Sequence, residues 1–334
     1  MELNLEREGL QAGLNPLGME GVEFIEYTTA RPQALGRHLE AMGFQLIARH
    51  RSREVLLYRQ GGMNVIVNAH GAEASGGDAA HPASPSIAAL AFRVRDAASA
   101  YRQAIERGAW AVPTQVEVME LNIPAIHGVG SSRIYFVDRY REFSIYDVDF
   151  IPIPGVERHP PALAGLHLFG AVQYIAENRT NDWTEFYAEL FGFTDLPDEQ
   201  RFGILPRGRV LRSPCGSFHL QLIEPWVEEP EFGLDEYYAR LGLGTPDVMA
   251  AVQALTARGV RFFDADAAAV GPRGALTHTE LGSVSFELVP SSASTPPGAV
   301  PPNTIPPSTI PPGTLASGDQ APGAAVPSAG RASP

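Results

Sequence analysis

The sequence predicts an α+β protein that is built from four βαβββ modules, two in each half, and that ends in an unfolded tail. The first observation is an internal repeat, in which an apolar strand, a polar break and an amphipathic helix recur in the same order. The second is composition, because 44% of the 334 residues are hydrophobic and 19% are charged, as is typical of globular proteins. The third is an abrupt change after Pro290 to proline, alanine, serine and glycine.

The first module begins with a strand that we expect over residues 21–28. Arg31 and Pro32 start a helix whose apolar residues keep helical spacing, and Gly43 ends this helix. Three short strands are expected next, at residues 45–50, 54–59 and 63–68.

The second module repeats this plan from Ser86. Asp96 is expected to cap its helix, because an aspartate side chain accepts hydrogen bonds from the free N–H groups of a first helical turn. Two strands, over residues 133–138 and 143–150, are expected to close the module.

The second half of the chain carries the third and fourth modules. In the third, strands are expected over residues 168–175 and 218–223, with an amphipathic helix between them. In the fourth, Thr245 is expected to cap a helix that has Pro246 in its first turn, and the final strand is placed at residues 283–289.

Proline-rich segments mark the predicted domain limits. The prolines between residues 152 and 161 interrupt any helix or sheet, so we expect one domain over residues 13–152 and another over 160–290. Residues 291–334 contain Pro-Pro pairs every five residues, which favours an extended, disordered tail. This tail is either a solvated spacer or a peptide ligand for a partner domain.

The net charge and the cysteine content limit the partners and the cellular compartment that we expect for this protein. The formal net charge of −13, with no basic run, argues against a nucleic acid or an anionic membrane surface as partner. The single cysteine, Cys215, cannot form an internal disulfide, which fits a reducing compartment. Neither a signal peptide nor an apolar run approaching the roughly 20 residues of a spanning helix is visible. We therefore expect a cytoplasmic protein with a small-molecule ligand, and homo-oligomerisation is left open.

Several long, collinear stretches resemble the 4-hydroxyphenylpyruvate dioxygenase family, above all its bacterial members. The stretches are NPLGMEGVEFIEY (15–27), HRSREVLLYRQG (50–61), AFRVRDAASAY (91–101), MELNIPAIHGVG (119–130), SIYDVDF (144–150) and DWTEFYAELFGF (182–193). The resemblance implies two tandem vicinal-oxygen-chelate barrels, the second of which holds Fe(II) on two histidines and a glutamate. It also implies conversion of an aromatic 2-oxoacid in tyrosine breakdown with O₂.

The resemblance places only one of the three iron ligands on a matching residue. Glu287 falls on the glutamate position, whereas the two histidine positions fall on Gly170 and Arg240. Arginine stays protonated and has no free lone pair to give a metal. His167 is near the first position, but the alternation of strand side chains points it to the opposite face unless a bulge intervenes. We therefore expect that the Fe(II) chemistry has been lost and that iron is absent or weakly bound.

Two arrangements could replace the iron site. One is a rebuilt metal site of His219, His278 and Glu287, two nitrogens and a carboxylate, provided that all three point inward.

The other arrangement is free of metal. In it Arg240 pairs with Glu287 in place of the metal charge and leaves a binding protein for an aromatic or acidic molecule, or a lyase or isomerase with Glu287 as base. In either arrangement, Gly170, Gln221 and Phe286 are expected to line the pocket.

Overall fold

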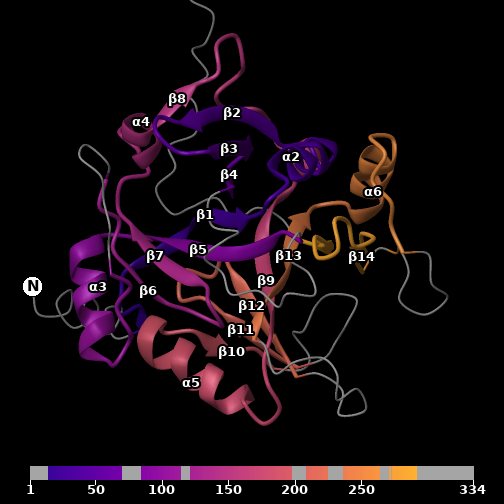
Figure 1. Ribbon diagram of the computed structural model, residues 1–334. Helices are drawn as coiled ribbons and strands as arrows, with labels where there is room; N and C mark the ends of the chain where they lie inside the picture. The colour runs from indigo at the N-terminus through magenta and orange to yellow at the C-terminus, as the bar shows by residue number, and fades with distance from the viewer. Residues whose placement is uncertain are drawn as a thin grey trace, which may run out of the picture. The chain divides into compact units, whose positions relative to one another are not determined.

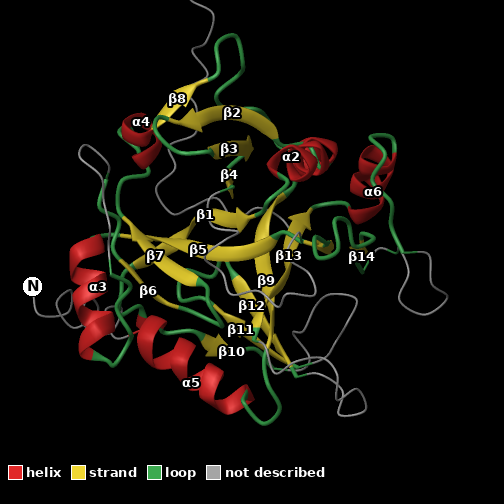
Figure 2. Ribbon diagram, in the orientation of Figure 1, coloured by secondary structure: helices red, strands yellow, loops and turns green. Residues whose placement is uncertain are grey.

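The computed structural model describes residues 14–69, 84–113, 121–197, 208–224, 236–263, 271 and 273–291. These residues belong to one compact unit, Met1–Thr295. They form two β-sheets with few helices, so the expected mixed α+β class is confirmed (Figure 2). The tail expected at residues 291–334 lies outside the described residues, apart from Ser291.

An eight-stranded sheet contains the described strands of the first half, in the order β6-β7-β5-β1-β4-β3-β2-β8 (Figure 1). Its strands are β1 (Met19–Thr28), β2 (Gln45–His50), β3 (Val55–Gln60), β4 (Met63–Asn68), β5 (Ser86–Val94), β6 (Ala125–His127), β7 (Arg133–Val137) and β8 (Phe150–Pro152). The helices among the described residues of this half are α2 (Pro32–Ala41), α3 (Ala97–Glu106) and α4 (Ile145–Asp149).

The helix signals of the first half act as expected. Pro32 occupies the first turn of α2, where its missing N–H group leaves no helical hydrogen bond unmade. Gly43 follows this helix with a φ of +97°, a conformation that glycine adopts without strain. The Asp96 side chain accepts a hydrogen bond from Ser99 N and caps α3.

The strand expected at residues 143–150 is wrong over most of its length. The segment forms helix α4, and only Phe150 continues into β8, which pairs with β2. A capping box explains the helix, because Ser144 and Asp147 each bond to the other's backbone N–H group. This local hydrogen bonding outweighs the strand propensity of the apolar residues.

A seven-stranded sheet contains the strands of the second half, in the order β10-β11-β12-β9-β13-β15-β14. Its strands are β9 (His167–Tyr174), β10 (Thr194–Asp195), β11 (Arg209–Arg212), β12 (His219–Ile223), β13 (Tyr237–Thr245), β14 (Ala275–Leu276) and β15 (Phe286–Pro290). The helices are the short 3₁₀ helix η2 (Leu163–Gly165), α5 (Thr180–Phe191) and α6 (Val248–Thr256).

The cap of α6 lies two residues later than expected. Asp247, not Thr245, is the N-cap residue, and its side chain accepts a hydrogen bond from Ala250 N. Thr245 is instead the last residue of β13, and its hydroxyl donates to Ala164 O at 2.8 Å. The strand therefore extends further than the Thr-Pro signal indicated.

The main hydrophobic core draws residues from both halves of the chain. Phe92 on β5 packs its ring 5.3 Å from that of Phe191, 6.4 Å from that of Phe193 and 6.0 Å from that of Phe218. β5 also runs beside β13 (Figure 1). The two sheets are therefore held together by packed aromatic side chains.

A second apolar cluster, which we call the inner cluster, covers one face of the eight-stranded sheet. It consists of Phe24, Ile47, Ala48, Val55, Leu57, Ile66, Ala91, Val137, Ile145, Tyr146 and Phe150.

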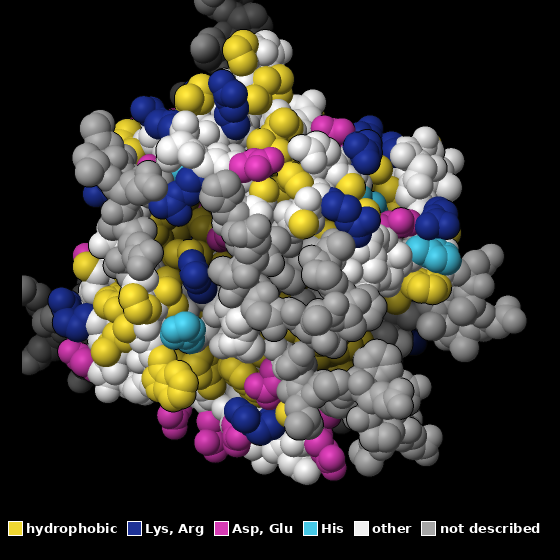
Figure 3. Space-filling model, in the orientation of Figure 1, with side chains coloured by type: hydrophobic (Ala, Val, Ile, Leu, Met, Phe, Trp, Pro, Cys, Tyr) yellow, Lys and Arg dark blue, Asp and Glu magenta, His cyan; other side chains and the backbone are white. Residues whose placement is uncertain are grey.

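The surface shows no large region of one charge on the face in Figure 3. There, basic and acidic side chains of the described residues alternate with polar and apolar ones. None of the helices in the described ranges combines the length and apolar character needed to cross a membrane.

Candidate functional site

The three positions that the resemblance assigned to iron ligands lie together in the seven-stranded sheet. Gly170 on β9 pairs with Gly242 on β13, and Gly242 pairs in turn with Glu287 on β15. Arg240 precedes Gly242 by two residues and so lies on the same face of the sheet. The prediction that Gly170, Arg240 and Glu287 line one site is therefore consistent with the strand register.

A buried ion pair occupies this site. Arg240 Nε donates a hydrogen bond to Glu287 Oε2 at 3.2 Å, and each residue is only 5% exposed. The pairing expected from the sequence is thus present. Arg240 Nη2 is buried without a hydrogen-bond partner in the part of the chain that the structure describes. The guanidinium therefore keeps a donor that none of the described residues satisfies.

A small cavity of about 20 Å³ adjoins the ion pair, with room for about one water molecule. Gly170, His219, Gln221 and Glu287 line it, and most of the remaining lining is apolar. The expected pocket positions of Gly170 and Gln221 agree with this lining.

Phe286 does not line the cavity, contrary to expectation. It is fully buried and stacks on His38 of α2, with a ring distance of 5.8 Å. Because strand side chains alternate, Phe286 lies on the face of β15 opposite to Glu287.

Gly170 is held in close contact with the neighbouring strand. A Cβ atom added there would lie 2.3 Å from His219 O of β12, a distance that real Cβ atoms do not reach. At Gly242 the nearest atom to an added Cβ is 3.6 Å away, an ordinary contact. A side chain at position 170 therefore requires the backbone to move.

A bulge in β9 also places His167. The pairing of β9 with β13 shifts by one residue between Gly242 and Leu243. His167 therefore lies opposite Gly244, whereas a regular ladder would place it opposite Thr245. Its ring bonds to Gly165 O at 3.1 Å and to Ser291 Oγ at 3.2 Å. His167 thus shares the face of Gly170 but is engaged near the end of β15.

The expected metal set of His219, His278 and Glu287 is not assembled. The ring of His219 stacks on Phe169 at 4.4 Å, whereas that of His278 stacks on Phe263 at 4.3 Å. Across the described ranges, no group of three His, Cys, Asp or Glu side chains is arranged to hold a metal ion. Among the described side chains, the two imidazoles instead stack on different aromatic rings and form no metal-binding group with Glu287.

Burial also sets the protonation of His219. Removal of the imidazole from water lowers the pKa of His219 to about 4, although the bond of its Nδ1 to Phe169 O acts in the opposite direction. At neutral pH the ring beside the cavity is uncharged.

Comparison with known proteins identifies the family. The model of the N-terminal domain of hydroxyphenylpyruvate dioxygenase matches residues 14–151. A 4-hydroxyphenylpyruvate dioxygenase of Pseudomonas aeruginosa is 33% identical over 267 residues, covering 74% of this chain and 72% of that protein. The chain belongs to the 4-hydroxyphenylpyruvate dioxygenase family.

Two further relatives show how far the similarity extends. A 4-hydroxyphenylpyruvate dioxygenase of a Pseudomonas species is 41% identical over 184 residues, which cover 54% of this chain and 51% of that protein. A mutant of 4-hydroxymandelate synthase from Streptomyces coelicolor has a similar structure, with a TM-score of 0.64 and 17% identity, covering 81% of this chain and 92% of that one. The second likeness concerns the fold alone.

The residues at the family's iron position do not fit Fe(II). Gly170 has no side chain and no room for one, and Arg240 is a cation without a lone pair for a metal. Glu287, the remaining ligand, already binds Arg240.

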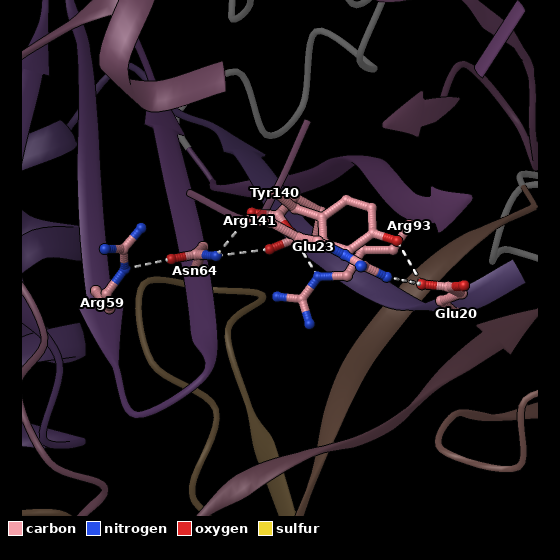
Figure 4. A network of polar contacts seen from close by, with 7 residues as sticks. All are labelled: Glu20, Glu23, Arg59, Asn64, Arg93, Tyr140 and Arg141. Carbon is pink, nitrogen blue, oxygen red and sulfur yellow. Dashed lines mark hydrogen bonds and ion pairs between the residues drawn. The ribbon is translucent and has the colours of Figure 1, made fainter. Parts of the chain in front are cut away.

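One polar network in the first half was missed by the sequence reasoning. Glu23, Arg59, Asn64 and Arg93 bond to one another beside the inner cluster (Figure 4). The sequence did contain a signal for this network. Arg59, Asn64 and Arg93 each lie two residues from an apolar residue of the inner cluster, so strand alternation places them on the same face.

Proposed function

We propose that this member of the 4-hydroxyphenylpyruvate dioxygenase family does not oxidise an aromatic 2-oxoacid with Fe(II), and that it works by binding a small acidic or aromatic molecule. The observation that carries this proposal is the buried ion pair of Arg240 and Glu287 at the family's iron position. Breaking such a pair leaves a buried charge without compensation and costs about 3–5 kcal/mol. Glu287 is therefore not available to a metal at small cost.

The close contact between Gly170 on β9 and the neighbouring strand β12 supports the same proposal. A histidine at position 170 would drive its Cβ into His219 O, so two features, not one, oppose an iron site. The cavity of about 20 Å³ has room for about one water molecule, far less than an aromatic 2-oxoacid with iron would fill.

A metal-free lyase or isomerase with Glu287 as base is less well supported. A general base needs a carboxylate that can reach the proton it removes. The hydrogen bond from Arg240 holds the Glu287 carboxylate in the ion pair and away from a substrate proton.

Metal analysis together with oxygen uptake tests the proposal. The protein is purified anaerobically with added Fe(II), its iron content is measured, and oxygen consumption is followed with 4-hydroxyphenylpyruvate. We expect iron well below one atom per chain and no substrate-dependent uptake. The Pseudomonas aeruginosa relative, prepared in the same way, is the positive control. Stoichiometric iron with uptake on this substrate would overturn the proposal.

Two variants test which of the positions 170 and 240 prevents iron binding. Arg240→His alone is expected to leave uptake absent, because position 170 still lacks an imidazole. The double variant Gly170→His/Arg240→His restores all three ligand types in sequence, yet we expect no iron binding because the added Cβ collides with β12. Iron binding by the double variant would show that the close contact between position 170 and β12 does not prevent a histidine from binding iron there.

We further infer the finer organisation that the sequence suggested. The element order, with a long strand before each of α2, α3, α5 and α6, supports four βαβββ modules in two domains at residues 13–152 and 160–290. A cytoplasmic location, assembly into a homo-oligomer and a role of the proline-rich tail in partner binding belong to the same proposal. Limited proteolysis and light scattering test the domain limits and the oligomeric state.

A further inference from the structure

The last turn of helix α2 is a place where the first half of the chain is held to the second half. Arg258, just after α6, donates from Nε to Ala41 O at 3.0 Å and from Nη2 to Glu40 O at 2.6 Å (Figure 1). These carbonyls lie at the C-terminal end of α2, where the partial negative charge of a helix favours a cation. We call this contact, together with that of His38 and Phe286, the α2 joint.

His38 makes the second contact of the α2 joint. Its ring stacks on the ring of Phe286, with the centroids 5.8 Å apart and the planes inclined by 27°. Phe286 on β15 is fully buried. The turn that precedes β15 also reaches the first half, because Ser283 Oγ donates to Pro85 O. A histidine side chain of the first half therefore supports the final strand of the second half.

One nitrogen of the His38 ring has no partner among the described residues. His38 Nε2 is buried and makes no hydrogen bond within this part of the chain. In a neutral imidazole Nε2 can be the nitrogen without a proton, whereas both nitrogens of an imidazolium carry N–H groups. Protonation of the closed joint would thus bury a charged N–H group without an acceptor, which costs more than an unfilled lone pair.

The charged groups of the second half do not offset this burial. Glu280, in the turn before β15, favours a protonated His38, but its Oε1 already accepts a hydrogen bond from Arg261 Nη2 at 2.7 Å. His278 is a further titratable group near Glu280, and Arg258 adds a positive charge at the end of α2. Burial outweighs the effect of Glu280 and lowers the pKa of His38 below its ordinary value of 6.5.

The groups on and beside α2 add no net charge around His38. Arg37 and Glu40 of the same helix are exposed and carry opposite charges. Tyr58 packs on α2 next to Gly36, and burial raises the pKa of Tyr58 to about 12, so its hydroxyl stays uncharged at neutral pH. The burial of the His38 ring therefore governs its protonation.

We propose that the α2 joint is an acid-sensitive contact between the two halves of the chain, which closes with a neutral His38 and loosens when this ring takes up a proton. In acid the imidazolium leaves Phe286 for water, and β15 loses one of its supports. The open joint binds the proton more readily than the closed one, so the closed joint loses stability as the pH falls below about 6.5. Arg258 keeps its charge throughout and is the pH-independent part of the joint. Loosening requires neither iron nor a ligand.

Hydrogen exchange of the full chain at about pH 7.5 and about pH 5.5 tests the joint, with each rate divided by the intrinsic exchange rate at that pH. We expect protection of the last turn of α2 and of β15 to fall by up to about tenfold at the lower pH, one unit below the ordinary pKa of histidine. His38→Phe keeps an aromatic ring against Phe286 but has no titratable group, so its protection should be the same at both pH values. Unchanged protection in the unmodified protein, or an equal fall in His38→Phe, would overturn the proposal.

Two further variants separate the sensor from its surroundings. Arg258→Met removes the pH-independent bonds and should lower the protection of α2 at both pH values, with the same fall between them. His219→Gln removes another buried imidazole that titrates in acid and should leave the fall at α2 unchanged. A fall that disappears in His219→Gln would place the sensor on β12 and contradict the role of His38. Because the readout is hydrogen exchange and not iron content or oxygen uptake, its failure is distinct from that of the proposed function.

Discussion

A glycine on β9 decides what the site in the seven-stranded sheet can hold. Gly170 lies against His219 O, and Gly242 on the neighbouring strand has an ordinary contact distance at the same place. Two glycines of similar surroundings therefore differ in the space that they leave for a side chain.

Gly170→Ala is expected to lower the free energy of unfolding by about 1–3 kcal/mol, because overpacking moves the backbone or neighbouring atoms. Gly242→Ala is the matched control and should change it by less than about 1 kcal/mol, helped by the reduced entropy of the unfolded chain. Urea unfolding of both variants measures the difference. Equal effects of the two substitutions would show that the close contact at Gly170 is not a constraint.

The ion pair of Arg240 and Glu287 should behave as one unit. Arg240→Met alone is expected to cost about 3–5 kcal/mol in unfolding free energy, since it removes the cation that pairs with the buried Glu287 carboxylate. Adding Glu287→Leu should recover most of that loss. A double-mutant cycle measured by denaturant unfolding gives the coupling, and additive losses would contradict a direct interaction.

His219 should make stability depend on pH. Its pKa is about 4 in the folded protein against an ordinary value of 6.5, so between these values the unfolded chain binds more protons. Stability therefore falls as the pH is lowered from about 6.5 towards 4. Comparing the unfolding free energy of the protein and of His219→Gln across this range should show a smaller slope in the variant. Parallel curves would contradict the burial of the imidazole.

At the scale of elements, the sequence was most informative where one local signal dominates. Periodicity and Pro32 predicted the start of α2, and Asp96 was correctly predicted as the cap of α3. Residues 143–150 were predicted as a strand because their apolar content was weighed without the capping box of Ser144 and Asp147. The stacking of His219 and His278 on different rings could not be predicted, because it depends on contacts between residues distant in sequence.

The corrected cap of α6 gives a prediction for this element. Asp247→Ala should lower the free energy of unfolding by about 1 kcal/mol, because Ala250 N loses its hydrogen-bond acceptor. Asp247→Asn keeps an acceptor at the same place and should cost little. Thermal unfolding of the two variants provides the measurement, and equal losses would point to charge rather than capping.

For the whole molecule, Phe92 links the two sheets. Its ring packs against Phe191, Phe193 and Phe218, all from the second half. Truncation of the Phe92 side chain should therefore destabilise both sheets.

Phe92→Ala is expected to cost about 3–5 kcal/mol and to lower hydrogen-exchange protection in β1 and in β12 together. Phe24→Ala is the control, because Phe24 belongs to the inner cluster and packs near Tyr135 of its own half. It should lower protection mainly in the eight-stranded sheet. Loss of protection confined to one sheet in Phe92→Ala would mean that the two sheets open separately.

The bulge in β9 has a consequence for the length of this strand. The extra residue near Phe169 lets His167 share the face of Gly170 although the two lie three residues apart. Removing that one residue would therefore leave both side chains on their present face and give β9 a regular ladder with β13 at this place.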